Sequence, residues 1–195
     1  MVGEHPELLR STAALFEAAR RDRADVVELL LDLGTPIDLE NGEKERALHI
    51  AAYQNAVRVA ELLIARGAEI DPVETSWGNT PIDGAIYAQH PAMIELLGRY
   101  SSDVWCLVFV GQIDRLRDVL REHPDAARAS WRGWTLLMRL PGDEGRATEV
   151  ATLLIEHGAH AAAKNEQGET AADLAAKRGM DSVAALLRNA EVPAT

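Results

Sequence analysis

Apolar positions follow a helical period that breaks and restarts along the chain. From Leu48 to Ala52, small and branched apolar residues occupy one face of a helix, and after a break near Asn55 a second apolar stripe runs from Val59 to Leu63. Gly67 then stands where a helix can end on a left-handed residue. The pattern predicts two short helices joined by a turn. Because this unit is too small to bury its own apolar faces, we expect neighbouring copies of it.

Copies of this pattern recur along most of the chain. Aligned on one equivalent position, they begin at residues 13, 46, 80, 102, 135 and 170, so that successive starts differ by 33, 34, 22, 33 and 35 residues. A period near 33 with two helices and a turn is typical of a stacked helical solenoid. We therefore expect an all-α fold, with residues 1–195 forming one domain of about six repeats at approximately 13–45, 46–79, 80–101, 102–134, 135–169 and 170–191.

Three short motifs recur at equivalent places in the copies. The first is Thr80-Pro81-Ile82-Asp83, at the start of the third copy, and the second is Ala51-Ala52, in the second copy. The third is Gly78-Asn79-Thr80, where the second copy meets the third. In these motifs the chain, over roughly residues 13–188, resembles the ankyrin repeat family. The resemblance implies an α-solenoid in which a short β-hairpin, here called a finger, connects the second helix of each repeat to the next repeat.

The third and fourth copies are closer together than the others. Their starts are 22 residues apart, so that about eleven residues are missing and one finger should be absent between them. Ser102 or Asp103 is then expected to cap the next helix. The seven apolar residues of Val104–Val110 could form a buried strand or a helix, but the amphipathic segment after them favours a helix.

The fifth copy carries Pro141 and Gly142 where the family has part of its first helix. Proline and glycine interrupt helices, so we expect this helix to stop early. A loose loop over Gly142–Gly145, with the lowest local stability in the chain, should follow.

Composition and charge narrow the cellular setting and the partners. Apolar residues make up 47% of the chain, aromatic residues 5%, and the formal net charge is −11. The charge argues against nucleic acid or an anionic membrane as the main partner. Cys106 is the single cysteine, and we expect it to be an inert thiol in the core. Residues 1–11 lack the features of a signal peptide, and no apolar run is long enough to span a bilayer. A cytoplasmic protein is expected, and the Ala- and Arg-rich usage is compatible with a bacterial one.

The sequence offers no arrangement typical of a catalytic, cofactor or metal site. It has no phosphate-binding glycine loop, no paired cysteines and no nucleophile elbow. His49 falls at the family's turn position, where a structural role is expected, and His157 with His160 is a poor metal pair because the two residues straddle a turn. We therefore expect a protein that is not an enzyme and that holds no cofactor or metal.

The resemblance implies that a partner binds the concave side, which consists of the finger tips and the two positions after each Ala-Ala pair. Tyrosine, tryptophan and arginine dominate binding hot spots, and they recur at these positions. The alternatives are that the aromatic rings only pack against neighbouring helices, and that the basic residues of the end repeats only keep those repeats hydrated. The predicted contact residues are Arg20, Arg21, Tyr53, Gln54, Trp77, Asn79, Tyr87, Phe109, Val110, Trp131, Arg132, Trp134, Lys177 and Arg178.

Three functions remain open on the sequence. The first is a monomeric, non-enzymatic scaffold or adaptor that binds a protein partner on its concave face. The second is an acidic inhibitor or immunity-type neutraliser of a basic protein, whose binding would weaken steeply with salt. The third and least favoured is a small-molecule or catalytic site near Trp105 and Phe109, where the finger is missing.

Overall fold

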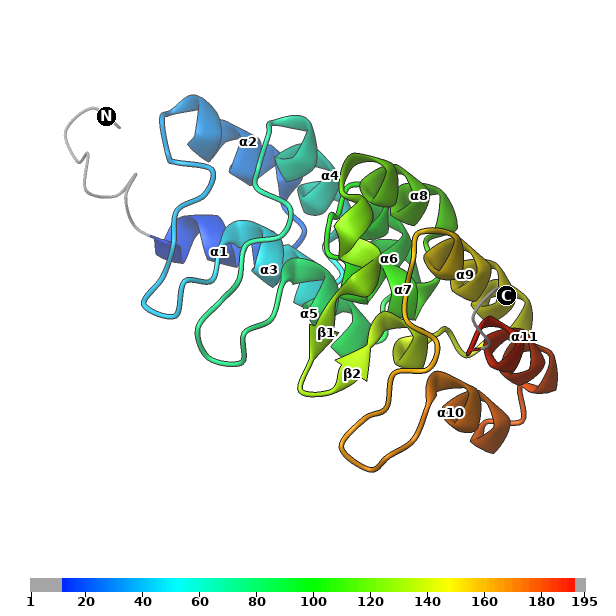
Figure 1. Ribbon diagram of the computed structural model, residues 1–195. Helices are drawn as coiled ribbons and strands as arrows, with labels where there is room; N and C mark the ends of the chain where they lie inside the picture. The colour runs from blue at the N-terminus through cyan, green and yellow to red at the C-terminus, as the bar shows by residue number, and fades with distance from the viewer. Residues whose placement is uncertain (1–11, 192–195) are drawn as a thin grey trace. The chain divides into compact units, whose positions relative to one another are not determined.

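The computed structural model describes residues 12–191, most of which lie in short helices (Figure 1). The chain divides into two compact units, with the boundary between Ser101 and Ser102. The described part of the first unit is residues 12–101 and that of the second unit is residues 102–191. The N-terminal stretch considered above for a signal peptide, residues 1–11, lies outside the described residues.

The first unit consists of three helix pairs. The first helices of the pairs pack side by side in one row and the second helices in another, and the connecting segments 33–46 and 66–80 project past the row of first helices (Figure 1). These two segments are the first and second fingers, but the β-hairpins expected there are not formed, because neither segment contains a strand. The pairs are α1 (Thr12–Arg20) with α2 (Ala24–Asp32), α3 (Ala47–Tyr53) with α4 (Val57–Ala65), and α5 (Pro81–Tyr87) with α6 (Pro91–Gly98).

Capping explains where the first helices begin. Thr80 precedes α5, and its backbone N–H donates to the carboxylate of Asp83 at 3.0 Å. Pro81 follows at the first helical position, where its missing N–H has no intrahelical partner to lose. Thr170 caps α10 in the same way, since its backbone N–H donates to the carboxylate of Asp173 at 3.0 Å.

The ends of the helix pairs use left-handed residues. The left-handed glycine predicted at Gly67 is confirmed by its φ of +83°, and Gly34 and Gly158 adopt the same conformation with φ of +96° and +82°. A positive φ is easily adopted only by glycine and costs other residues energy, which explains the glycine after each of these second helices.

The second unit also contains three pairs, but its middle pair is irregular. The helix α7 (Val104–Val110) pairs with α8 (Ile113–Glu122), the 3-10 turn η4 (Leu136–Arg139) with α9 (Glu144–Glu156), and α10 (Ala171–Lys177) with α11 (Asp181–Glu191). Between α8 and η4 lie the 3-10 turn η3 (Pro124–Arg128) and a two-stranded antiparallel hairpin of β1 (Ser130–Trp131) and β2 (Trp134–Thr135), in which Trp131 pairs with Trp134.

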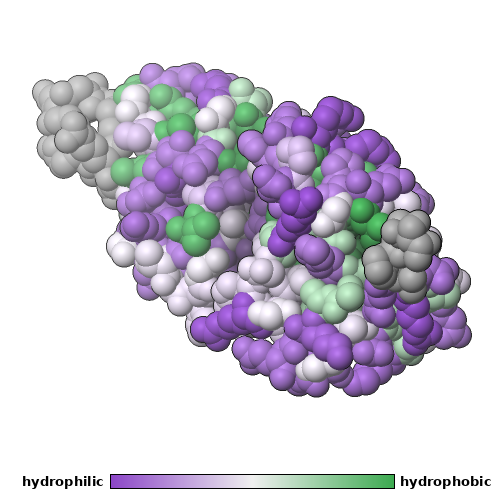
Figure 2. All heavy atoms as spheres, in the orientation of Figure 1, coloured by the Kyte–Doolittle hydropathy of each residue, from purple (hydrophilic) through white to green (hydrophobic). Residues whose placement is uncertain are grey.

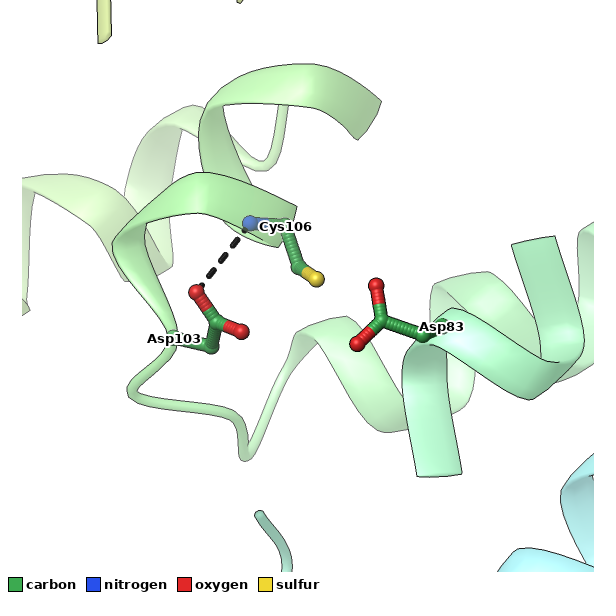
Figure 3. A group of neighbouring side chains, drawn as sticks. All are labelled: Asp83, Asp103 and Cys106. Carbon is green, nitrogen blue, oxygen red and sulfur yellow. Dashed lines mark hydrogen bonds between the residues drawn. The ribbon is translucent and has the colours of Figure 1, made fainter. Parts of the chain in front are cut away.

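The apolar run Val104–Val110 is a helix, as predicted, rather than a strand. Only five residues, 99–103, separate it from α6, and no strand or 3-10 turn lies among them, in agreement with the expected missing finger. Of the two expected caps the structure uses Asp103, whose carboxylate accepts from the backbone N–H of Trp105 at 2.9 Å and of Cys106 at 3.3 Å. Figure 3 shows the bond to Cys106.

The fifth repeat bears out one expectation and corrects another. Its first helix does stop early, as the four-residue 3-10 turn η4 before Pro141. The expected loose loop over Gly142–Gly145 is wrong for its second half, because α9 already begins at Glu144. The reason is a cap: the Asp143 carboxylate accepts from the backbone N–H of Arg146 at 2.8 Å and so starts the helix beside a glycine.

Each unit buries its own layer of apolar side chains between the two rows of helices. Leu48, Leu63 and Met93 are fully buried in the first unit, and Leu120 and Leu154 in the second. The face drawn in Figure 2 is mainly hydrophilic, with hydrophobic side chains in small separate groups.

Candidate functional site

A groove of about 710 Å³ opens in the first unit between the fingers and the row of first helices. Residues of α1, α3 and α5 form one side, and the two fingers form the other. Three successive pairs therefore contribute to one surface, although each pair is too short to build it alone. The residues that line it are Arg20, Glu43, Glu45, His49, Ile50, Tyr53, Gln54, Glu74, Ser76, Trp77, Asn79, Thr80, Gly84 and Tyr87.

Three aromatic side chains dominate the groove, and all three are exposed. The rings of Tyr53 and Tyr87 stack with their centroids 6.3 Å apart and their planes at 17°. The exposed fraction is 49% for Tyr53, 78% for Tyr87 and 86% for Trp77. The stacking follows from the repeat, because both tyrosines end the first helix of their pair and α3 packs against α5.

Gly84 keeps the space between α3 and α5 open. It lies inside α5 with no left-handed conformation, and a Cβ atom placed on it would lie 3.9 Å from the Cβ of Tyr53. A larger side chain at this position would fill the floor of the groove beside the tyrosine pair.

Glu74 organises the finger that presents Trp77. Its buried carboxylate accepts from the backbone N–H groups of Ser76, of Trp77 at 2.9 Å and of Asn79 at 3.0 Å. Burial by itself raises the pKa of Glu74, but these backbone donors outweigh it and hold the pKa below its usual value. Trp77 is therefore exposed on a turn whose backbone N–H groups at Ser76, Trp77 and Asn79 are bonded to Glu74.

The first finger uses an asparagine at the same place. The Asn41 side-chain oxygen accepts from the N–H groups of Glu43 and Glu45, both at 2.9 Å. The turn closed by Glu74 is one residue longer, and the longer glutamate side chain spans it. The two fingers are also joined, because Thr75 donates its N–H to the carbonyl of Glu43 at 2.8 Å.

His49 anchors the base of the groove. Its Nδ1 accepts from the backbone N–H of Arg46 at 3.1 Å, so the ring proton lies on Nε2 and is donated to the carbonyl oxygen of Pro72 at 3.1 Å. Burial lowers the pKa of this imidazole, with smaller opposing contributions from its backbone partners and from Glu45 and Glu74. The neutral ring thus caps α3 and ties it to the second finger, which is the structural role expected from the sequence.

Carboxylates outnumber cations along the groove. Glu43, Glu45 and Glu74 line it, and Arg20 is the one basic side chain among its lining residues within 12–191. The guanidinium of Arg20 also forms an ion pair with the carboxylate of Glu17, with a nitrogen–oxygen distance of 3.7 Å. The groove therefore combines exposed aromatic rings with a negative charge.

The structure brings together six of the predicted contact residues. Arg21 is not among them: it pairs with Glu17 at 2.6 Å and does not line the groove. Sequence reasoning missed the acidic lining residues Glu43, Glu45 and Glu74, although their place on the fingers could have indicated them. The six predicted residues that line the groove are Arg20, Tyr53, Gln54, Trp77, Asn79 and Tyr87.

The predicted contact residues of the second unit form no part of this groove, and their role stays a prediction. The guanidinium of Arg139 lies 5.2 Å from the ring centroid of Phe109, and that of Arg132 lies 4.8 Å from the ring centroid of Trp131. Val110, beside Phe109, is partly buried.

The remaining three predicted residues have local partners. Trp134 is partly buried against the core of the second unit, and Lys177 forms an ion pair with Glu169. Arg178 donates to the backbone carbonyl oxygens of residues 140 and 141, at 2.9 and 2.7 Å. These contacts are structural, and none of them tests whether a partner also binds there.

Comparison with known proteins agrees with this architecture. The family model "Ankyrin repeats (3 copies)" matches residues 15–108. This part of the chain is similar to ankyrin repeats. An ankyrin repeat domain from Acinetobacter baumannii, solved by crystallography, superposes with a TM-score of 0.66 at 21% identity, over 92% of this chain and 98% of the bacterial domain. The whole described chain thus has the ankyrin repeat fold that its motifs suggest.

Two curated plant proteins are similar to about half of this chain in sequence. A serine/threonine-protein kinase numbered 12 from Arabidopsis thaliana is 32% identical over 96 residues, which is 49% of this chain and 21% of the kinase. The serine/threonine-protein kinase VIK of the same plant is 31% identical over 94 residues, or 48% of this chain and 21% of that kinase. The chain spans about a fifth of the length of these relatives. Ankyrin repeats are in general protein–protein interaction modules.

Within residues 12–191, every helix is too short or too polar to cross a lipid bilayer.

Proposed function

We propose that this protein is a non-enzymatic interaction module whose first-unit groove binds an extended segment of a protein partner. One observation carries the proposal: Tyr53, Tyr87 and Trp77 are exposed together on one groove. Aromatic side chains bury a large area when a partner covers them and lose few rotamers in doing so.

Hydrogen bonds hold the backbone that carries these aromatic side chains, which favours a role in binding. The Trp77 backbone is held by Glu74, and the finger is joined to its neighbour through Thr75 and Glu43. The His90 ring nitrogen Nε2 also lies 3.1 Å from the carbonyl oxygen of Tyr53, which links the third pair to the second. Preordered side chains lose little entropy when a partner binds, so such a groove can use its contact area for affinity.

A catalytic role finds no support in the groove. Both ring nitrogens of His49 are hydrogen-bonded to backbone groups, and the Glu74 carboxylate is bonded to three backbone N–H groups. These groups stabilise the fold and are not available for acid–base work. The alternative site near Trp105 gains no support either, since Trp105 packs against the core of the second unit and Arg139 covers Phe109.

Selection from a displayed library of random peptides tests the proposal. We expect peptides to be enriched on the full chain and to lose binding to the triple variant Tyr53→Ala/Tyr87→Ala/Trp77→Ala. Tyr100→Ala is the matched control, because Tyr100 is exposed to 48% but does not line the groove. If every enriched peptide bound the folded triple variant as well as the native chain, the groove would not be the binding site.

A further inference from the structure

We infer that the segment bound in the groove is basic, with an arginine or lysine side chain placed against the Tyr53–Tyr87 pair. This inference rests on the proposed function and adds the chemistry of the partner. Its basis is the juxtaposition, in one groove, of exposed aromatic faces and carboxylates.

Two of the carboxylates line the same groove as the tyrosine rings. Glu43 and Glu45 are on the first finger and line the same groove as Tyr53. Within residues 12–191 no basic side chain forms an ion pair with Glu43, and Glu45 accepts a hydrogen bond from the neutral amide of Asn41 at 2.7 Å. Both negative charges thus lack a counter-ion from the described chain.

Exposed aromatic rings attract cations by their negative faces, and a nearby carboxylate adds a direct charge attraction. Two other exposed aromatic rings of this chain illustrate the first effect, since Arg132 lies over Trp131 and Arg139 over Phe109. The described cation–aromatic contacts are these two, both in the second unit. The tyrosine pair of the first unit therefore offers this interaction to an incoming side chain.

The length of the groove indicates an extended segment. Its lining residues belong to α1, α3 and α5, and neighbouring packed helices lie about 8–10 Å apart. Two such steps are about 16–20 Å, which about six extended residues span. A nucleic acid is disfavoured because its phosphates would face Glu43, Glu45 and Glu74, and an acidic or purely apolar segment would leave these charges unpaired.

Fluorescence anisotropy with three labelled peptides of about eight residues tests the inference. The peptides share a Gly/Ser background and carry three arginines, three leucines or three glutamates. The full chain is compared with Glu43→Gln/Glu45→Gln and with Tyr53→Ala/Tyr87→Ala. The charge-matched control is Glu61→Gln/Glu122→Gln, since both glutamates are exposed and lie outside the groove. Circular dichroism verifies the fold of each variant.

We expect the arginine peptide to bind most tightly. The affinity for this peptide should fall about tenfold in both groove variants and less than about twofold in the control variant. Raising the salt concentration from about 0.05 M to about 0.5 M should weaken it further, because the pairs are exposed.

Three results would overturn the inference, and they differ in what they say of the groove. Tighter binding of the leucine peptide, lost in Tyr53→Ala/Tyr87→Ala but not in Glu43→Gln/Glu45→Gln, leaves the groove as a binding site and removes its basic partner. Equal weakening by the control variant shows attraction to the net charge alone. If none of the three peptides binds, the inference of a basic partner is wrong. Whether the groove binds a peptide at all is then tested separately by the library selection.

Discussion

Replacing His49 should weaken the first unit and change its pH dependence. His49→Ala removes the acceptor of the Arg46 N–H and the donor to the buried Pro72 carbonyl. Each such bond contributes about 1 kcal/mol, and a buried group left without a partner adds about 1–3 kcal/mol, so we expect a loss of about 2–4 kcal/mol. His49→Asn offers a side-chain oxygen to the Arg46 N–H, as Asp83 does for Thr80, and should cost roughly half as much.

The pH dependence has a definite sign. Burial lowers the pKa of His49 in the folded protein, so between that value and the unfolded value of about 6.5 the unfolded chain binds more protons. The stability from neutral His49 is therefore complete above about pH 6.5 and is lost as the pH falls below it. The slope approaches at most about 1.4 kcal/mol per pH unit.

Denaturant unfolding followed by circular dichroism, at several values between about pH 5 and about pH 8, measures this dependence. His49→Asn should flatten the curve in the acid range, whereas His160→Asn, at an exposed position, should leave it nearly unchanged. The pKa of His49 can be read directly by NMR. A measured pKa at or above about 6.5, or an unchanged slope in His49→Asn, would refute the reasoning.

Three further substitutions test other parts of the structure. Gly84→Ala should raise the stability of the first unit by about 0.5–1 kcal/mol, measured by denaturant unfolding, because the new methyl group has room and the helix gains propensity; a destabilised variant would show that the position is more crowded than it is here. Asp103→Ala should cost about 1 kcal/mol and Asp103→Asn much less, since asparagine also caps helices; equal losses would contradict the capping role. Arg178→Ala should cost about 1–2 kcal/mol in thermal or denaturant unfolding, and Lys177→Ala less than about 0.5 kcal/mol, because Arg178 bonds to two backbone carbonyls while Lys177 forms an exposed ion pair; the reverse order would contradict the structural role of Arg178.

The repeat and the helix pairs could be predicted from the sequence because they depend on local patterns. The apolar stripe from Val59 to Leu63, the Thr80 cap and the glycine at position 67 each act within a few residues of chain. The helical state of Val104–Val110 was also predictable from the amphipathic segment after it. The loop over Gly142–Gly145 was mispredicted because the glycines suggested a break, while the side chain of Asp143 started a helix.

The sequence alone therefore determined the repeated helix pairs and the aromatic residues at equivalent positions, since short-range hydrogen bonds and apolar periodicity decide these. Only the tertiary structure decided which of those residues share a surface. It stacked Tyr53 on Tyr87, joined two fingers through Thr75, and placed Glu43 and Glu45 in the same groove as the rings. Packing between successive helix pairs brings together residues about thirty positions apart, and no local pattern encodes that neighbourhood.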